Sequence, residues 1–235
     1  MNQSHGRIRA ITLDVGGTLI QPWPSVGHVY ARVAAEFGLP GLPPQWLNDQ
    51  FKCAWAARGA FDYTRPAWQR LVNRTFAGVI QQPVAPECFD RIYQQFVQAE
   101  SWQTFADVVP TLKHLRDRRI RLGVISNWDE RLEPLLERLD LARWFEAIVV
   151  SHQLNCVKPA PAIFRHAAER LDCDPEEILH VGDSAEDDVA GARAAGFQAA
   201  RIDRSDPGSS KETVSDLSAL VGLLSPQRGE GRGEG

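Results

Sequence analysis

The amino-acid sequence predicts an α/β fold with a parallel sheet and one all-helical block inserted after the first strand. Three observations lead to this prediction. After Thr104, short apolar segments alternate with amphipathic segments of about a dozen residues, the pattern of βαβ units. A further apolar strand opens the chain at residues 7–14 and needs those later strands as partners. The residues between them show helical periodicity without a clear strand.

Each element can be placed from its local pattern. The segment RIRAITLD (7–14) is typical of a buried strand, and the two glycines that follow it end that strand. Inside the inserted block, prolines and glycines separate helical segments at 25–38, 43–57, 65–80 and 86–99. Later strands are predicted at 120–126, 145–151, 176–183 and 197–203, and later helices at 109–118, 129–139, 159–171, 187–196 and 214–224.

These elements define three predicted parts of the chain. The sheet core consists of residues 7–20 and 104–224, and a helical cap consists of residues 21–103. Residues 225–235 are charged and low in complexity, so we expect them to be disordered. Because the insertion follows the first strand directly, it is expected above the edge where parallel strands end, in the position of a lid.

The composition argues against several kinds of protein. With 43% hydrophobic and 24% charged residues, a chain of 235 residues can form a full apolar core. A formal net charge of −4 does not suit a protein that binds nucleic acid without regard to sequence. No apolar run approaches the ~20 residues that span a bilayer, and no signal peptide is recognised. The four cysteines are widely spaced, which indicates reduced thiols, so we expect a cytoplasmic protein without a membrane or nucleic-acid partner.

Acidic side chains follow two of the predicted strands. Asp14 and Asp183 each end an apolar strand, and Asp187 and Asp188 lie in the first turn of the next helix. Carboxylates gathered at one sheet edge would repel one another without a cation, and their hard oxygen atoms favour Mg²⁺. An alternative for Asp187 and Asp188 is that they only stabilise the helix N-terminus, where acidic residues are favoured.

Lys158, Ser126 and Asn127 supply positive charge and hydrogen-bond donors near the same edge. Lys158 precedes a proline in the loop before a helix, and it can neutralise a phosphoryl group or a carboxylate nucleophile there. Ser126 and Asn127 follow the strand RLGVI, where a hydroxyl and an amide fit phosphate oxygens. Taken singly, the lysine also fits a solvated surface position, and Ser126 and Asn127 also fit a helix N-cap.

Taken together, these motifs resemble the haloacid dehalogenase superfamily. They are DVGGTL at 14–19, SN at 126–127, KP at 158–159 and GDSAEDDVAGA at 182–192, and they follow that family's order. The long gap after the first motif is similar to the family's helical cap. The segments TRPAWQRLV and VISNWDERLE look closest to the haloacid-dehalogenase-like-domain-containing hydrolases. The resemblance reaches to about Arg201, and it implies a Rossmann-like parallel sheet core with an inserted α-helical cap domain.

The resemblance also implies a role for each matched position. Asp14 is expected to be the nucleophile that forms an aspartyl-phosphate, and Thr18 is expected to hold the loop that orients it. Lys158 is expected to stabilise the nucleophile and the transferred group. The implied substrate-binding residues are Ser126 and Asn127, and the implied Mg²⁺ site consists of Asp14, the backbone carbonyl of Gly16, Asp183 and, in support, Asp188.

Gly16 departs from the pattern of the family's phosphatases. Those enzymes carry a second aspartate two residues after the nucleophile, as general acid and base. Such a group is worth ~10²–10⁴ in rate. Glycine can neither protonate a leaving alkoxide nor activate water, so a cap residue would have to do so. By residue type alone, the candidates are His28, Tyr30 and Glu36.

Four other functions fit part of the pattern. The DxGGT loop also resembles the phosphate loop of sugar kinases and actin-like proteins, although that superfamily's second loop is missing. A 2-haloacid dehalogenase also lacks the second aspartate, but its site is metal-free where this chain has GDSAEDD. Phosphonate-cleaving relatives use a cap lysine, and the inserted block carries Lys52. The fourth is a binding or regulatory module on a catalytically impaired enzyme fold.

We interpret most aromatic and basic residues of the cap as structural residues. Tryptophans at helical spacing are expected in a core, whereas Trp23 and Trp128, beside the motif loops, are expected to wall the pocket. Arg32, Arg58 and Arg65 can meet an acidic substrate, but solvated positions are the usual place for such side chains. The sequence therefore predicts a Mg²⁺-dependent hydrolase of a small phosphorylated metabolite, acting as a monomer or homodimer, and slow if nothing replaces the missing acid.

Overall fold

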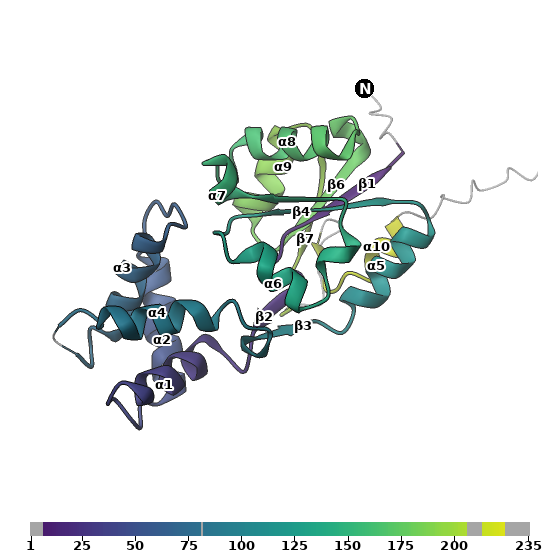
Figure 1. Ribbon diagram of the computed structural model, residues 1–235. Helices are drawn as coiled ribbons and strands as arrows, with labels where there is room; N and C mark the ends of the chain where they lie inside the picture. Colours follow the sequence, from purple (N-terminus) through teal and green to yellow (C-terminus); the bar gives the residue numbers. More distant parts are fainter. Residues whose placement is uncertain (1–6, 81, 206–212, 224–235) are drawn as a thin grey trace, which may run out of the picture.

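A parallel β-sheet forms the centre of the protein in its computed structural model, which describes residues 7–80, 82–205 and 213–223 (Figure 1). In this described part, six strands lie in the order β5-β4-β1-β6-β7-β8, and each neighbouring pair is parallel. The strands are β1 (Ala10–Leu13), β4 (Arg121–Ser126), β5 (Ala147–Val150), β6 (Ile178–Gly182), β7 (Gln198–Ile202) and β8 (Thr213–Val214). The first strand of the chain is therefore central, and the predicted α/β fold is confirmed.

Helices cover both faces of this sheet (Figure 1). One apolar cluster joins the sheet to α5 (Val108–Asp117), α6 (Leu132–Arg138) and α10 (Ala219–Leu223). A second joins it to α8 (Pro161–Leu171) and α9 (Gly191–Ala194). Because both faces are covered, β1 is buried along its whole length, which explains why it is apolar without alternation.

Four helices of the described chain make up the inserted block. They are α1 (Val26–Glu36), α2 (Pro44–Ala56), α3 (Arg65–Phe76) and α4 (Pro86–Gln95), as the sequence predicts. Ser25 and Thr64 cap α1 and α3 by accepting hydrogen bonds from the backbone of His28 and Ala67. The block has its own apolar cluster, so its helices pack mainly on one another, beside the sheet core (Figure 1). We refer to it as the cap.

Two short antiparallel strands join the cap to the core. β2 (Ile20–Pro22) pairs with β3 (Trp102–Thr104), with Ile20 opposite Thr104. The sequence predicts no strand between about residues 22 and 102, and this pair lies at the two ends of that interval. Strands of three residues are too short to show a period. Because the chain leaves and re-enters the core at one place, the cap stands near the edge where β1 ends (Figure 1).

Two helices of the core differ most from their predicted extent. Instead of one helix over 187–196, a π-helical turn, η4 (Ala185–Ala190), precedes α9, because the Ser184 side chain caps the turn by accepting from the backbone of Asp187. The predicted helix over 214–224 begins at Ala219. The β-branched Thr213–Val214 instead form β8, and the Val214 carbonyl accepts from the backbone of Asp203 at 2.8 Å.

The remaining described elements are one short helix and three single turns. They are α7 (Ser151–Leu154), η1 (Ala99–Ser101), η2 (Ala142–Trp144) and η3 (Pro175–Glu177). None of the helices in the described ranges combines the length and the low polarity that a bilayer crossing requires. The tail 225–235, for which the sequence predicts disorder, lies outside the described residues.

Candidate active site

The carboxyl ends of three adjacent strands bring the predicted site residues together. Asp14 directly follows β1, Ser126 is the last residue of β4, and Asp183 directly follows β6. Since β1 pairs with both β4 and β6, these residues lie at one edge of the sheet. Lys158 reaches the same edge from the loop before α8.

Lys158 is the central cation of this edge. Its Nζ atom donates to Oδ1 of Asp14 at 2.7 Å and to Oδ1 of Asp188 at 2.5 Å, and also to the carbonyl of Ile125 at 3.0 Å. Ser126 donates its hydroxyl to the same Oδ1 of Asp14 at 2.9 Å. Burial by itself lowers the pKa of Lys158, but the charges of Asp14 and Asp188 outweigh it and hold that pKa above its ordinary value. Lys158 is therefore a buried, charged lysine and not a solvated one.

Asp188 holds Lys158 from the other side. Its Oδ1 also contacts Nε2 of His180 at 3.1 Å, and its Oδ2 accepts from the backbone of Ser184 at 2.9 Å. Burial opposes ionisation, but Lys158 and His180 hold the pKa of Asp188 well below its usual range. The sequence analysis missed His180, which lies inside the apolar strand β6 with Nδ1 2.9 Å from the hydroxyl of Thr12. Nothing in the strand pattern distinguishes it from a core residue.

Three of the predicted metal ligands form a compact acidic cluster. Asp14, Asp183 and Asp188 each offer an oxygen, and these atoms lie within 4.8 Å of one another. Desolvation and the charges of Asp14 and Asp188 raise the pKa of Asp183 to about 7. An all-oxygen donor set of this kind fits Mg²⁺. That these residues bind a metal remains a prediction.

The two glycines after Asp14 have different structural roles. Gly17 has a φ of +74°, and a Cβ atom there would lie 2.5 Å from Oδ2 of Asp183, so glycine is required for the close approach of the loop. At Gly16 the nearest atom to such a Cβ is Cζ3 of Trp128, at 3.4 Å, which is ordinary contact. Gly16 lines the cavity. This position is compatible with the expected binding of the metal by its carbonyl.

Thr18 and Asn127 make contacts that the sequence did not predict. The Thr18 hydroxyl is buried and has no hydrogen-bond partner among the described residues, while its carbonyl accepts from Arg204 at 2.6 Å. Asn127 lies beside Ser126 as expected, but its amide brackets Lys158, accepting from the backbone N–H at 2.7 Å and donating to the carbonyl at 3.1 Å. The structure thus shows Asn127 fixing the lysine loop.

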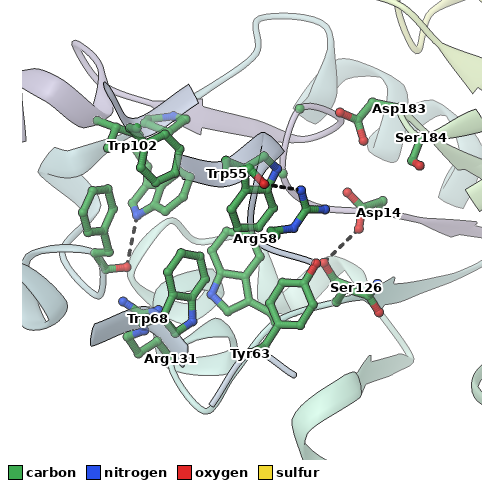
Figure 2. A pocket seen from close by; sticks show the side chains of 18 of the residues that line it. Asp14, Trp55, Arg58, Tyr63, Trp68, Trp102, Ser126, Arg131, Asp183 and Ser184 are labelled. Atoms are coloured by element: carbon green, nitrogen blue, oxygen red, sulfur yellow. Dashed lines mark hydrogen bonds between the residues drawn. The ribbon is translucent and has the colours of Figure 1, made fainter. Parts of the chain in front are cut away.

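A cavity of about 490 Å³ lies between this edge of the sheet and the cap. Figure 2 shows Asp14, Ser126 and Asp183 on one side and aromatic residues on the other. The sequence analysis assigned the cap tryptophans to a core, but Trp55 and Trp68 line this cavity. Helical spacing could not decide this, because a ring facing a cavity and a ring facing a core recur with the same period.

The cap residues proposed as a substitute acid or base are mostly elsewhere. Of the three, Tyr30 lines the cavity, and burial raises its pKa further above its ordinary value. Nδ1 of His28 is hydrogen-bonded to the hydroxyl of Ser25 at 2.7 Å, and Oε2 of Glu36 forms an ion pair with Nε of Arg91 at 3.0 Å. Of the two residues expected to wall the pocket, Trp128 does so, whereas Trp23 is 47% exposed and is not among the lining residues.

Two further cap residues, Arg58 and Tyr63, belong to the candidate site. On the outside of the cap, Arg32 donates a hydrogen bond to Gln95, and Arg65 donates one to Asp90. Arg58 instead lines the cavity, and it forms no ion pair with any described residue. Tyr63 also lines the cavity. Burial and the charge of Asp187 raise the pKa of Tyr63 to about 12, so it remains a protonated phenol.

Several known proteins are similar to this chain along most of its length. The family model described as haloacid dehalogenase-like hydrolase matches residues 8–196. The chain is 33% identical over 214 residues to the haloacid dehalogenase-like hydrolase domain-containing protein 3 of Mus musculus, covering 86% of this chain and 84% of that protein. It is 26% identical over 253 residues to a phosphoglycolate phosphatase of Shigella boydii, covering 97% and 98%.

A solved structure supports the same fold. The L-2-haloacid dehalogenase of Xanthobacter autotrophicus matches with a TM-score of 0.73 at 19% identity, covering 92% of this chain and 98% of that one. At this identity the likeness concerns the fold alone. The family model covers most of the chain and the mouse relative is matched along most of its length, so the chain belongs to the haloacid dehalogenase-like hydrolase family.

Proposed function

We propose that the protein is a cytoplasmic, Mg²⁺-dependent phosphatase of a small phosphorylated compound, with Asp14 as nucleophile. One observation carries this proposal: Asp14 accepts hydrogen bonds from Lys158 and Ser126 while it also belongs to the acidic cluster with Asp183 and Asp188. A carboxylate held between a buried cation and a metal site is equipped to attack phosphorus. The phosphoglycolate phosphatase among the relatives supports this reaction class.

The contacts of Asp14 distinguish its two oxygens. Lys158 and Ser126 both hold Oδ1, and Oδ2 accepts no hydrogen bond from the described residues. We assign the attack to Oδ2: it forms a bond to phosphorus, the ester P–O bond breaks, and the electron pair leaves on the alcohol oxygen. Burial and the charge of Asp188 raise the pKa of Asp14, and the charge of Lys158 and the hydrogen bonds from Lys158 and Ser126 oppose that rise. A bound Mg²⁺ would neutralise the phosphoryl oxygens and the acidic cluster.

The aspartyl-phosphate must then be cleaved by water. The oxygen of that water attacks phosphorus, the bond to Oδ2 of Asp14 breaks with its electron pair returning to the carboxylate, and the proton of the water passes to solvent as phosphate leaves. In most enzymes a general base takes the proton of the water, and Gly16 cannot do so. The cap side of the cavity offers no carboxylate or imidazole among the described residues, so this second step is expected to limit turnover.

A time course with p-nitrophenyl phosphate tests the proposal. The assay uses enzyme at a concentration that makes one turnover visible, with Mg²⁺ or with EDTA. Asp14→Asn removes the nucleophile, and Asp117→Asn, on the exposed surface of α5, is the matched control. We expect metal-dependent release by the unmodified protein and by the control, and none by Asp14→Asn.

The shape of the time course separates the alternatives. Steady release supports turnover, and a burst of one equivalent followed by a stall supports Asp14 as a nucleophile whose intermediate lacks a base. Release that survives Asp14→Asn would contradict the assignment. No release at all would favour a binding module, or a dehalogenase, which would act on a 2-haloacid in the presence of EDTA. The Schiff-base mechanism of phosphonate cleavage has no support, because Lys52 is exposed and does not line the cavity.

A further inference from the structure

The cap side of the cavity is lined by aromatic rings that are only partly buried. Trp55 and Trp68 lie nearly parallel, with centroids 5.9 Å apart and planes inclined by 20°. Tyr63 stands edge-on to both, at 6.4 and 6.3 Å. Trp102 and Trp128, from β3 and from the loop after β4, lie 5.3 Å apart. We call these five residues the aromatic box, and each of them lines the cavity. Figure 2 labels four of them, Trp55, Tyr63, Trp68 and Trp102.

Polar groups beside the box are few, and the two arginines among them already have partners. The guanidinium of Arg131 pairs with buried Asp129 at 2.6 Å and lies 3.6 Å over the ring of Tyr93. Arg58 lies 3.9 Å over the ring of Trp55 and donates to its carbonyl at 2.7 Å. Nε of Arg58 and Nε1 of Trp68 are buried without a hydrogen-bond partner among the described residues, so this side of the cavity offers a leaving group few free donors. A polyhydroxylated leaving group buried here would lose more hydrogen bonds to water than these two donors replace. A flat aromatic group loses few such bonds and gains stacking.

The neighbourhood of Gly16 favours the same kind of group. Cζ3 of Trp128 lies 3.4 Å from the place where a side chain at position 16 would begin, so an aromatic ring adjoins the position where the family's phosphatases carry their acid. Without that acid, an alkoxide would have to leave unprotonated, although its conjugate acid is about as weak as water, with a pKa near 15.7. A phenol has a pKa of about 10, so a phenolate can leave without a proton donor.

We propose that the substrate is a phosphate monoester of an aromatic hydroxyl compound, with its ring held in the aromatic box. This inference rests on the proposed phosphatase function and specifies its leaving group. The cavity of about 490 Å³ has room for such an ester, because small-molecule sites range over ~300–1,000 Å³. Asp14 and the box line one cavity, so a ring in the box presents its phosphate to the nucleophile.

The chemical step balances without a protein acid. Oδ2 of Asp14 forms a bond to phosphorus as the bond from phosphorus to the aryl oxygen breaks. The electron pair of that bond leaves with the phenolate, which takes its proton from solvent after it departs. The leaving group therefore needs nothing from position 16, whereas hydrolysis of the aspartyl-phosphate still needs an activated water.

Binding of non-hydrolysable analogues tests the inference independently of turnover. Phenylphosphonate and cyclohexylphosphonate share a head group and differ in whether the ring is flat and aromatic. Calorimetry with Mg²⁺ should show phenylphosphonate binding about fivefold to tenfold more tightly. Trp68→Leu should abolish this preference. Trp46→Leu, which changes a partly buried tryptophan of the cap outside the cavity, should keep it. Trp55→Leu serves if Trp68→Leu does not fold.

The outcomes distinguish this inference from the function on which it rests. Equal affinities for the two phosphonates, with p-nitrophenyl phosphate still hydrolysed, would overturn the aromatic substrate class and leave the phosphatase in place. A preference that survives both Trp68→Leu and Trp55→Leu would also overturn it. A preference for phenylphosphonate without any hydrolysis of p-nitrophenyl phosphate would support an aromatic ligand and contradict the proposed phosphatase function.

Discussion

Lys158 donates a hydrogen bond of 2.7 Å to Oδ1 of Asp14, and both side chains are almost completely buried. The same ammonium group contacts Asp188 at 2.5 Å. One ammonium group therefore compensates the charge of two carboxylates that are largely shielded from water. Its removal would leave both carboxylates with their remaining hydrogen bonds but without this cation between them.

Lys158→Met should impair both stability and activity. Methionine keeps the volume of the side chain but removes the charge, so the free energy of unfolding should fall by about 3 kcal/mol. Phosphatase activity should fall by ~10²–10³-fold, because the positive charge beside the nucleophile is lost. Chemical denaturation and p-nitrophenyl phosphate assays measure the two effects. Lys113→Met, on the exposed face of α5, is the control, and an equal loss in it would contradict the role of Lys158.

Gly16→Asp should restore the missing acid. A side chain at this position meets Trp128 at ordinary contact distance, and Gly16 is not in the left-handed region, so aspartate can be accommodated. Hydrolysis of alkyl phosphates should rise by ~10²-fold or more, while the first step with p-nitrophenyl phosphate should change little. Gly16→Asn has the same shape without the acid. If both variants behave alike in steady-state assays, the lack of an acid is not what limits the enzyme.

Without metal, the stability of the protein should depend on the ionisation of Asp183. Desolvation and the charges of Asp14 and Asp188 raise the pKa of Asp183 from 3.8 to about 7. Between these values the folded protein keeps a proton that the unfolded chain has lost. The free energy of unfolding of EDTA-treated protein should therefore fall as the pH rises through this window.

Asp183→Asn isolates this effect, because asparagine does not titrate. Melting temperatures measured from about pH 4 to about pH 8 should decline more steeply for the unmodified protein than for the variant. Above pH 7, Mg²⁺ should raise the melting temperature of the unmodified protein more than that of the variant. Parallel pH profiles, or an equal response to Mg²⁺, would remove Asp183 from the metal site.

The ion pair of Asp129 with Arg131 should matter far more than one on the surface. Arg131→Met leaves a fully buried carboxylate at Asp129 without its partner, which should cost about 3 kcal/mol of unfolding free energy. Arg143→Met removes an exposed pair with Asp140 and should cost less than about 1 kcal/mol. Urea denaturation of the two variants makes the comparison. Similar costs would mean that solvent reaches the Asp129 pair.

The strand-end residues were predictable because their positions follow from topology. Asp14, Ser126 and Asp183 each terminate an apolar run, and parallel strands bring such ends to one edge whatever their loops do. Short elements escaped prediction for the opposite reason. Three residues of β2 carry too little pattern, and Thr213–Val214 became a strand only because β7 offered a partner.

The sequence by itself therefore determined the α/β fold, the inserted helical block and the meeting of Asp14, Ser126 and Asp183 at one sheet edge, because strand and helix periods and strand-end chemistry are local properties. Tertiary structure alone decided that Lys158 is held by Asp188, that Asp188 contacts His180, that Trp128 adjoins Gly16, and that cap tryptophans face a cavity. These contacts join residues from separate elements. A helix face has the same apolar period whether it meets a core or an empty pocket, so only the packing of the cap against the sheet could distinguish them.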